Sequence, residues 1–129
     1  SSAQQTATTG KVYIHEFGHL FAGLGDEYVG GTEMSEFYPL HVEPWEANLT
    51  TLKDFDKKEW KQLLEKDTPI PTPADQNHEK TLGVYEGGGY AQKGVYRPYI
   101  SCLMNHFNVG YFCPVCTKAI TDMIDFHCK

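Results

Sequence analysis

The chain shows helical spacing of hydrophobic residues in three stretches, residues 11–23, 55–66 and 114–126. In each stretch apolar side chains recur every three or four positions, as they do along one face of a helix. Gly23 ends the first stretch, and Pro114 stands at the favoured first turn of the last. The pattern therefore predicts three helices, each with one side against a core.

The helix predicted over residues 11–23 carries different residues on its two faces. Tyr13, Phe17 and Leu20 mark an apolar face, which we expect to dock on the core. Two histidines of the same stretch fall on the opposite face, beside small residues. Elsewhere, the glycine- and tyrosine-rich residues 83–98 predict a hairpin or a rim loop. Residues 1–10 are small and polar and predict a mobile lead-in.

Composition narrows the possible partners. The chain has 129 residues, which fits one domain, and a net charge of -6 with acidic and basic residues interspersed. It has no basic patch, so nucleic acid is not an expected partner. It also has no apolar run of the ~18–20 residues that a membrane span needs.

The clearest chemical signal is an H-E-x-x-H pattern made by His15, Glu16 and His19. Residues four apart share one helix face, so both imidazoles can reach one Zn²⁺ ion at ~2.0–2.1 Å. Glu16 can then act as the general base on a zinc-bound water. A catalytic zinc needs a third protein ligand, and we expect Asp26, with Glu27 as the alternative. The pattern predicts a peptidase that uses one catalytic Zn²⁺.

Four cysteines stand in the last third of the chain: Cys102, Cys113, Cys116 and Cys128. A helix over residues 114–126 would separate Cys116 from Cys128 by about 18 Å, which is too far for a disulfide. We expect a disulfide from Cys102 to Cys113 or Cys116, which is typical of an exported protein. A structural zinc held by all four cysteines and a redox pair of Cys113 and Cys116 are the alternatives.

Five segments occur in a fixed order along the chain: His15-Glu16-x-x-His19-x-x-x-Gly23-Leu24-x-Asp26-Glu27-Tyr28, Tyr85-Glu86-Gly87, Tyr96-Arg97-Pro98, Cys102-Leu103-Met104 and Phe112-Cys113-Pro114-Val115-Cys116. Together they resemble the bacterial IgA peptidase family of zinc metallopeptidases. The resemblance covers about residues 12–120. It implies an exported bacterial endopeptidase that acts on a protein substrate.

The resemblance also implies a metzincin-like α+β catalytic domain, in which Met104 lies on a methionine turn beneath the metal. In such a domain the zinc helix packs beneath a sheet whose strands precede it in the chain. We therefore expect residues 1–129 to be the C-terminal part of the catalytic domain. The N-terminal sheet portion, which we expect to be absent from this sequence, is then an expected partner of the chain. The acidic third ligand departs from the usual metzincin pattern, in which a histidine stands one residue earlier.

Three further residues are expected near the reacting groups. His106 follows Met104 by two residues, where some metzincins carry a switching tyrosine, and it is a possible oxyanion donor. Tyr96 and Arg97 are alternative oxyanion or substrate contacts. The competing function is a non-catalytic carbohydrate- or protein-binding module of a surface protein with a structural or degenerate metal site. The tyrosine- and glycine-rich residues 84–99 would form its recognition surface.

Overall fold

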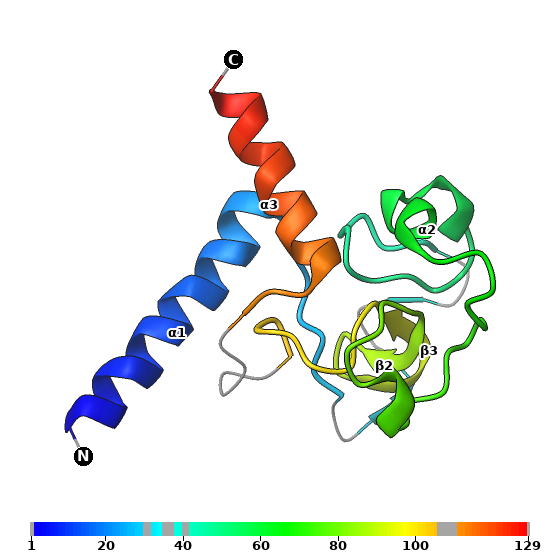
Figure 1. Cartoon of the computed structure of the whole chain (residues 1–129), viewed down its shortest axis with the longest axis horizontal. Coiled ribbons are helices and arrows are strands. Elements are labelled where there is room, and N and C mark those ends of the chain that lie inside the picture. The colour runs from blue at the N-terminus through cyan, green and yellow to red at the C-terminus, as the bar shows by residue number, and fades with distance from the viewer. Residues whose placement is uncertain (1, 30–31, 35–37, 40–41, 106–110, 129) are drawn as a thin grey trace.

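A computed structural model describes residues 2–29, 32–34, 38–39, 42–105 and 111–128, which form a small α+β fold (Figure 1). Its elements are, in chain order, α1 (Ser2–Ala22), β1 (Thr32–Met34), η1 (Phe55–Lys57), α2 (Glu59–Leu63), η2 (Gln76–His78), β2 (Tyr85–Gly88), β3 (Ala91–Arg97) and α3 (Pro114–His127), where η marks a 3-10 helix. Helix α1 extends away from the body of the molecule, and α3 meets it near its C-terminal end. None of the helices in the described ranges is long and apolar enough to cross a membrane.

Helix α1 begins earlier than the sequence predicts. It starts at Ser2, so the segment taken as a lead-in, residues 1–10, belongs to the helix from its second residue onward. Alanine and glutamine residues in this segment favour the helical conformation.

The orientation of α1 is also opposite to the prediction. Tyr13 and Leu20 on its apolar face are 72% and 87% exposed, whereas His15 on the other face is 2% exposed. The histidine face turns inward because His15 hydrogen-bonds to Leu103. Gly18 lies on the same inward face and leaves room for a close neighbour. The prediction that the apolar face docks on the core is therefore wrong for the described part of the chain.

The helix predicted over residues 55–66 is divided into η1 and α2. Lys58 separates them in an extended conformation with ψ 142°. Its ammonium group donates hydrogen bonds to the carbonyl oxygens of Pro44 and Glu46, at 2.7 and 2.6 Å. By contrast, the last predicted helix is confirmed, since α3 begins at Pro114.

The predicted hairpin is confirmed as β2 and β3, which pair antiparallel. Strand β1 pairs parallel to the other edge of β3, so the sheet order is β1-β3-β2. Gly89 and Tyr90 form the hairpin turn with positive φ values of 56° and 69°. Their amides donate to the carbonyl oxygens of Asp26 and Tyr28, both at 2.9 Å. The turn is thereby fixed against the segment that follows α1.

The main core lies between the start of α3, the 3-10 helix η1, α2 and the hairpin. Its buried members are Leu24, Phe55, Trp60, Val84, Tyr99, Cys102, Met104, Cys113, Val115 and Cys116. Trp60 is 1% exposed and packs edge-to-face on Phe55, with ring centroids 4.9 Å apart. Its indole N–H donates to the carbonyl of Gly83 at 2.9 Å, which links α2 to the segment before β2.

Trp60→Phe tests this link. The substitution keeps an aromatic ring but leaves the buried Gly83 carbonyl without its donor, so we expect a loss of about 1–3 kcal/mol in the free energy of unfolding. Trp45→Phe is the matched control, because Trp45 is 78% exposed and should change stability by at most about 0.5 kcal/mol. Urea denaturation measures both. Equal effects of the two substitutions would contradict the assignment.

Candidate metal centre

The H-E-x-x-H segment of α1 brings two imidazole nitrogens together. The Nε2 atoms of His15 and His19 lie 3.0 Å apart. Asp26 Oδ1 lies 3.0 Å from His15 Nε2 and 3.0 Å from His19 Nε2. The three atoms form a nearly equilateral triangle whose members are all of a kind that binds Zn²⁺. The structure thus places Asp26, and not Glu27, beside the two histidines.

Backbone carbonyls fix which nitrogen of each ring faces this triangle. His15 Nδ1 lies 3.0 Å from the carbonyl oxygen of Leu103, and His19 Nδ1 lies 2.6 Å from that of Leu24. A carbonyl oxygen can only accept, so each Nδ1 donates its proton. When the rings are neutral, the Nε2 atoms therefore carry the lone pairs, as in metal-binding histidines whose other nitrogen is held by a carbonyl. The residues present therefore fit a metal ion.

Asp26 reaches the histidines because the chain reverses after α1. Gly23 adopts a left-handed conformation with φ 64°, which ends the helix, and the amide of Leu24 then donates back to the carbonyl of Gly18 at 3.2 Å. Asn48 holds the returning segment. It accepts from the amide of Gly25 and donates to its carbonyl oxygen, both at 2.8 Å.

The electrostatics of the triangle favour charge separation between His15 and Asp26. Burial lowers the pKa of His15, but the hydrogen bond and charge of Asp26, together with the Leu103 carbonyl, outweigh it and raise that pKa. Burial likewise opposes ionisation of Asp26, yet hydrogen bonds from His15 and Tyr90 and the charges of the two histidines lower its pKa. Asp26 is therefore held as a carboxylate.

Glu16 is exposed on α1, next to the two histidines. Its charge contributes to raising the pKa values of His15 and Tyr28 and of Tyr90 in the hairpin turn. The carboxylate of Glu16 therefore faces solvent, and its charge acts on the side chains in and around the triangle.

Met104 packs against α1 at Gly18. It is fully buried, and a Cβ atom added at Gly18 would lie 3.0 Å from its sulfur. Gly18 stands between the two histidines of the motif, so the thioether occupies the space that a side chain there would fill.

The hairpin turn supplies a residue that the sequence analysis missed. The phenol of Tyr90 donates a hydrogen bond to Asp26 Oδ2, the carboxylate oxygen that does not face the histidines. This bond to Asp26 is the main reason why the pKa of Tyr90 is raised to about 12. The glycine-rich turn around Tyr90 indicated an unusual backbone conformation there. The contact with Asp26 could not be predicted, because the two residues are 64 positions apart in the chain.

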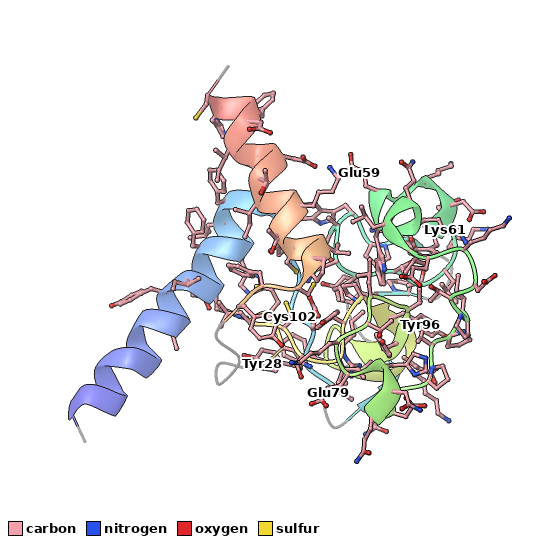
Figure 2. All side chains as sticks on the ribbon, viewed as in Figure 1. Tyr28, Glu59, Lys61, Glu79, Tyr96 and Cys102 are labelled. Atoms are coloured by element: carbon pink, nitrogen blue, oxygen red, sulfur yellow. The ribbon has the colours of Figure 1, made fainter. Side chains whose placement is uncertain are left out.

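Other expected contacts lie elsewhere. Arg97 is buried and donates to the carbonyl oxygens of Glu86 and Gly87, both at 3.0 Å. Tyr96 hydrogen-bonds to Glu86, and in Figure 2 it lies over the hairpin rather than on the side of α1, where Tyr28 and Cys102 are labelled. His106 lies outside the described residues.

The cysteines correct another prediction. All four are free thiols, so the expected disulfide from Cys102 to Cys113 or Cys116 is not formed. Cys102 Sγ and Cys116 Sγ lie 3.8 Å apart, because the start of α3 packs beside the segment that holds Met104. The disulfide was an argument for export, and the structure does not supply that argument.

Glu27 stands with the cysteines rather than with the histidines. Its side chain is fully buried, and burial raises its pKa well above the ordinary value, helped by charge on Cys102. Asp26 and Glu27 are neighbours in the chain but point into two different groups of potential ligands: His15, His19 and Asp26 in one, and Glu27, Cys102, Cys113 and Cys116 in the other.

An open pocket of about 300 Å³ lies beside the histidine group. His19 and Asp26 line it on one side, and the ring of Tyr90 and the side chains of Trp45 and Glu46 line it elsewhere. It gives a bound molecule access to the triangle of ligand atoms.

Fold and site together define the class: a small α+β domain with a candidate metal centre of two histidines and one carboxylate. A family model described as IgA peptidase M64 matches residues 2–80 and 74–124. The chain therefore belongs to the IgA peptidase M64 family, which confirms the resemblance and points to a peptidase rather than to a binding module. No curated protein matches the chain.

The coupling between His15 and Asp26 can be measured by nuclear magnetic resonance titration of the His15 ring in the presence of a chelator. Asp26→Asn removes the carboxylate that raises the pKa of His15, so that pKa should fall. In the wild type, the pair stabilises the fold until the pH falls through the lowered pKa of Asp26 or rises through the raised pKa of His15.

The control is Asp75→Asn, which removes the carboxylate that pairs with His78 instead. It should leave the His15 titration unchanged. An unchanged His15 pKa in Asp26→Asn would contradict the geometry of the triangle.

Proposed function

We propose that this chain is the metal-binding part of a zinc-dependent endopeptidase that hydrolyses peptide bonds of a protein substrate. The observation that carries the proposal is the triangle of His15 Nε2, His19 Nε2 and Asp26 Oδ1, with sides of 3.0 Å. These three residues would hold the ion. Membership of a peptidase family supports peptide-bond hydrolysis as the reaction.

The chain's own residues supply the remaining chemistry. When bound, Zn²⁺ acidifies water and polarises the scissile carbonyl. Glu16 accepts a proton from the water that attacks the carbonyl carbon, and returns a proton to the nitrogen as the C–N bond breaks. Two observations support this role: the carboxylate of Glu16 is exposed, and its charge acts on His15. The pocket lined by Trp45 and Glu46 would receive the substrate beside the ligands.

Tyr90 acts in this scheme as a positioning residue. Its phenol holds Oδ2 of Asp26, so that Oδ1 stays directed at the histidines. Groups that hydrogen-bond to metal ligands orient them and tune the affinity for the metal. Met104 supports the same ligands from below, in the manner of a metzincin methionine turn, because its sulfur fills the space at Gly18. A metzincin-like arrangement is thus part of the proposal.

Glu16→Gln tests the assignment of the base. The three ligands stay, so zinc content should be unchanged, but peptide hydrolysis should fall by several orders of magnitude because no group accepts the proton. Turnover of a quenched fluorescent peptide library, alongside zinc analysis, measures both quantities. Glu79→Gln, at an exposed site at the end of η2, is the control and should keep full activity (Figure 2). Activity that survives in Glu16→Gln would refute this mechanism.

Tyr90→Phe tests the positioning role. Removing one hydroxyl should weaken zinc affinity by about 10–100-fold, because Asp26 loses the bond that orients it. Competition with a chromophoric chelator gives the affinity. Tyr111→Phe is the matched control, since Tyr111 is 50% exposed and belongs to a different surface. Equal zinc affinities of Tyr90→Phe and the wild type would remove Tyr90 from the scheme.

A further inference from the structure

The second group of ligands in this chain has no part in the proposed hydrolysis. Cys102, Cys113, Cys116 and Glu27 each offer one ligand atom, and these four atoms lie within 4.8 Å of one another. All four residues are fully buried. Three thiols and a carboxylate lose their hydration at this buried point, and a shared cation would offset that cost.

Two distances within this group match a tetrahedral zinc site. With Zn–S bonds of ~2.3 Å, two sulfur ligands at the tetrahedral angle lie about 3.8 Å apart. The sulfur atoms of Cys102 and Cys116 are 3.8 Å apart. With a Zn–O bond of ~2.0 Å, a sulfur and an oxygen ligand lie about 3.5 Å apart, and Cys116 Sγ lies 3.3 Å from Glu27 Oε2. A disulfide would instead need about 2.05 Å between sulfur atoms.

The partners of Glu27 also point to a missing cation. Oε2 accepts from the side-chain Nδ2 of Asn48 at 2.8 Å, whereas Oε1 has no hydrogen-bond partner although it is buried. The guanidinium of Arg97 attracts Glu27 electrostatically, but its Nη1 donates to two backbone carbonyls. A metal ligand role for the Glu27 carboxylate, whose other oxygen contacts the Cys116 sulfur, would account for this unpartnered oxygen.

The spacing of the cysteines along the chain is typical of zinc sites. Cys113 caps the N-terminus of α3, and Cys116 follows in its first turn, so a Cys-x-x-Cys pair faces Cys102. The backbone amide of Cys113 also donates to Cys102 Sγ at 3.1 Å, a bond that supports a thiolate. Cys128 is exposed at the far end of α3 and takes no part.

From these contacts we propose that Glu27, Cys102, Cys113 and Cys116 bind a second, structural zinc ion. Thiolates and tetrahedral geometry select zinc among the common divalent cations. The ion would join three separate segments: the loop after α1, the turn that carries Met104 and the start of α3. Because Asp26 precedes Glu27 in the chain, the structural ion would also hold the third ligand of the catalytic centre in place. The inference does not depend on the proposed hydrolysis.

The test is zinc analysis combined with X-ray absorption at the zinc edge, on the protein purified without added chelator. We expect two zinc ions per chain and a sulfur shell at ~2.3 Å next to a nitrogen and oxygen shell at ~2.0–2.1 Å. In His19→Ala, which disturbs only the histidine group, zinc should fall to one ion per chain with the sulfur shell retained. Cys128→Ser is the matched control and should behave like the wild type.

Two results would overturn the structural zinc. One is a zinc spectrum without a sulfur shell in both the wild type and His19→Ala. The other is a Cys102–Cys116 or Cys102–Cys113 disulfide in an unreduced peptide digest. If only the proposed catalytic zinc is wrong, the wild type should instead contain a single zinc ion with a sulfur shell. Cys116→Ser should lose the sulfur shell. If this variant fails to fold, the wild type and His19→Ala still test the structural zinc, because both keep all four of its ligands.

Discussion

The site depends on two consecutive backbone carbonyls. Leu103 accepts a hydrogen bond from the ring of His15, and Met104 accepts one from the amide of Glu27. The first bond turns the histidine face of α1 inward and fixes the tautomer of one ligand. The second holds the loop after α1 against the same turn, and this places Asp26 beside both histidines. Buried backbone bonds of this kind are hard to replace, because either partner left alone would remain without water.

The same turn explains why two adjacent acidic residues serve different chemistry. Asp26 and Glu27 belong to two different groups of potential ligands although they are neighbours in the chain. Asp26 faces the histidines at the edge of an open pocket, where its pKa is lowered. Glu27 faces the thiols in the interior, where burial raises its pKa. The loop thus separates a partly exposed centre suited to reaction from a closed one suited to structural support.

The sequence predicted those features that follow from local spacing. The histidine pair, the start of α3 at Pro114 and the hairpin depend on residues close in the chain, and the structure has them there. The direction of α1 could not be read from its hydrophobic pattern. The inward bonds of His15 and the fit of Met104 against Gly18 override the apolar face, and both involve residues more than eighty positions away.

Long-range contacts also explain the remaining differences. The hydrogen bond from Tyr90 to Asp26 joins residues 64 positions apart, and no pattern in either segment predicts it. The sequence suggested a disulfide from Cys102 or a zinc held by all four cysteines, whereas the structure groups three of them and leaves Cys128 exposed. The missing fourth member was Glu27, which the sequence offered as an alternative ligand for the other centre. Lys58 interrupts a regular helical pattern because its side chain finds two carbonyl acceptors in another segment.

The proposed zinc centre of His15, His19 and Asp26 can be tested with an anomalous difference map from a crystal of the protein, collected on both sides of the zinc absorption edge. We expect a zinc peak bounded by the two Nε2 atoms and by Asp26 Oδ1, with an open side towards the pocket of Trp45 and Glu46. A crystal grown with zinc that shows no peak there, or a peak only among the cysteines, would contradict it.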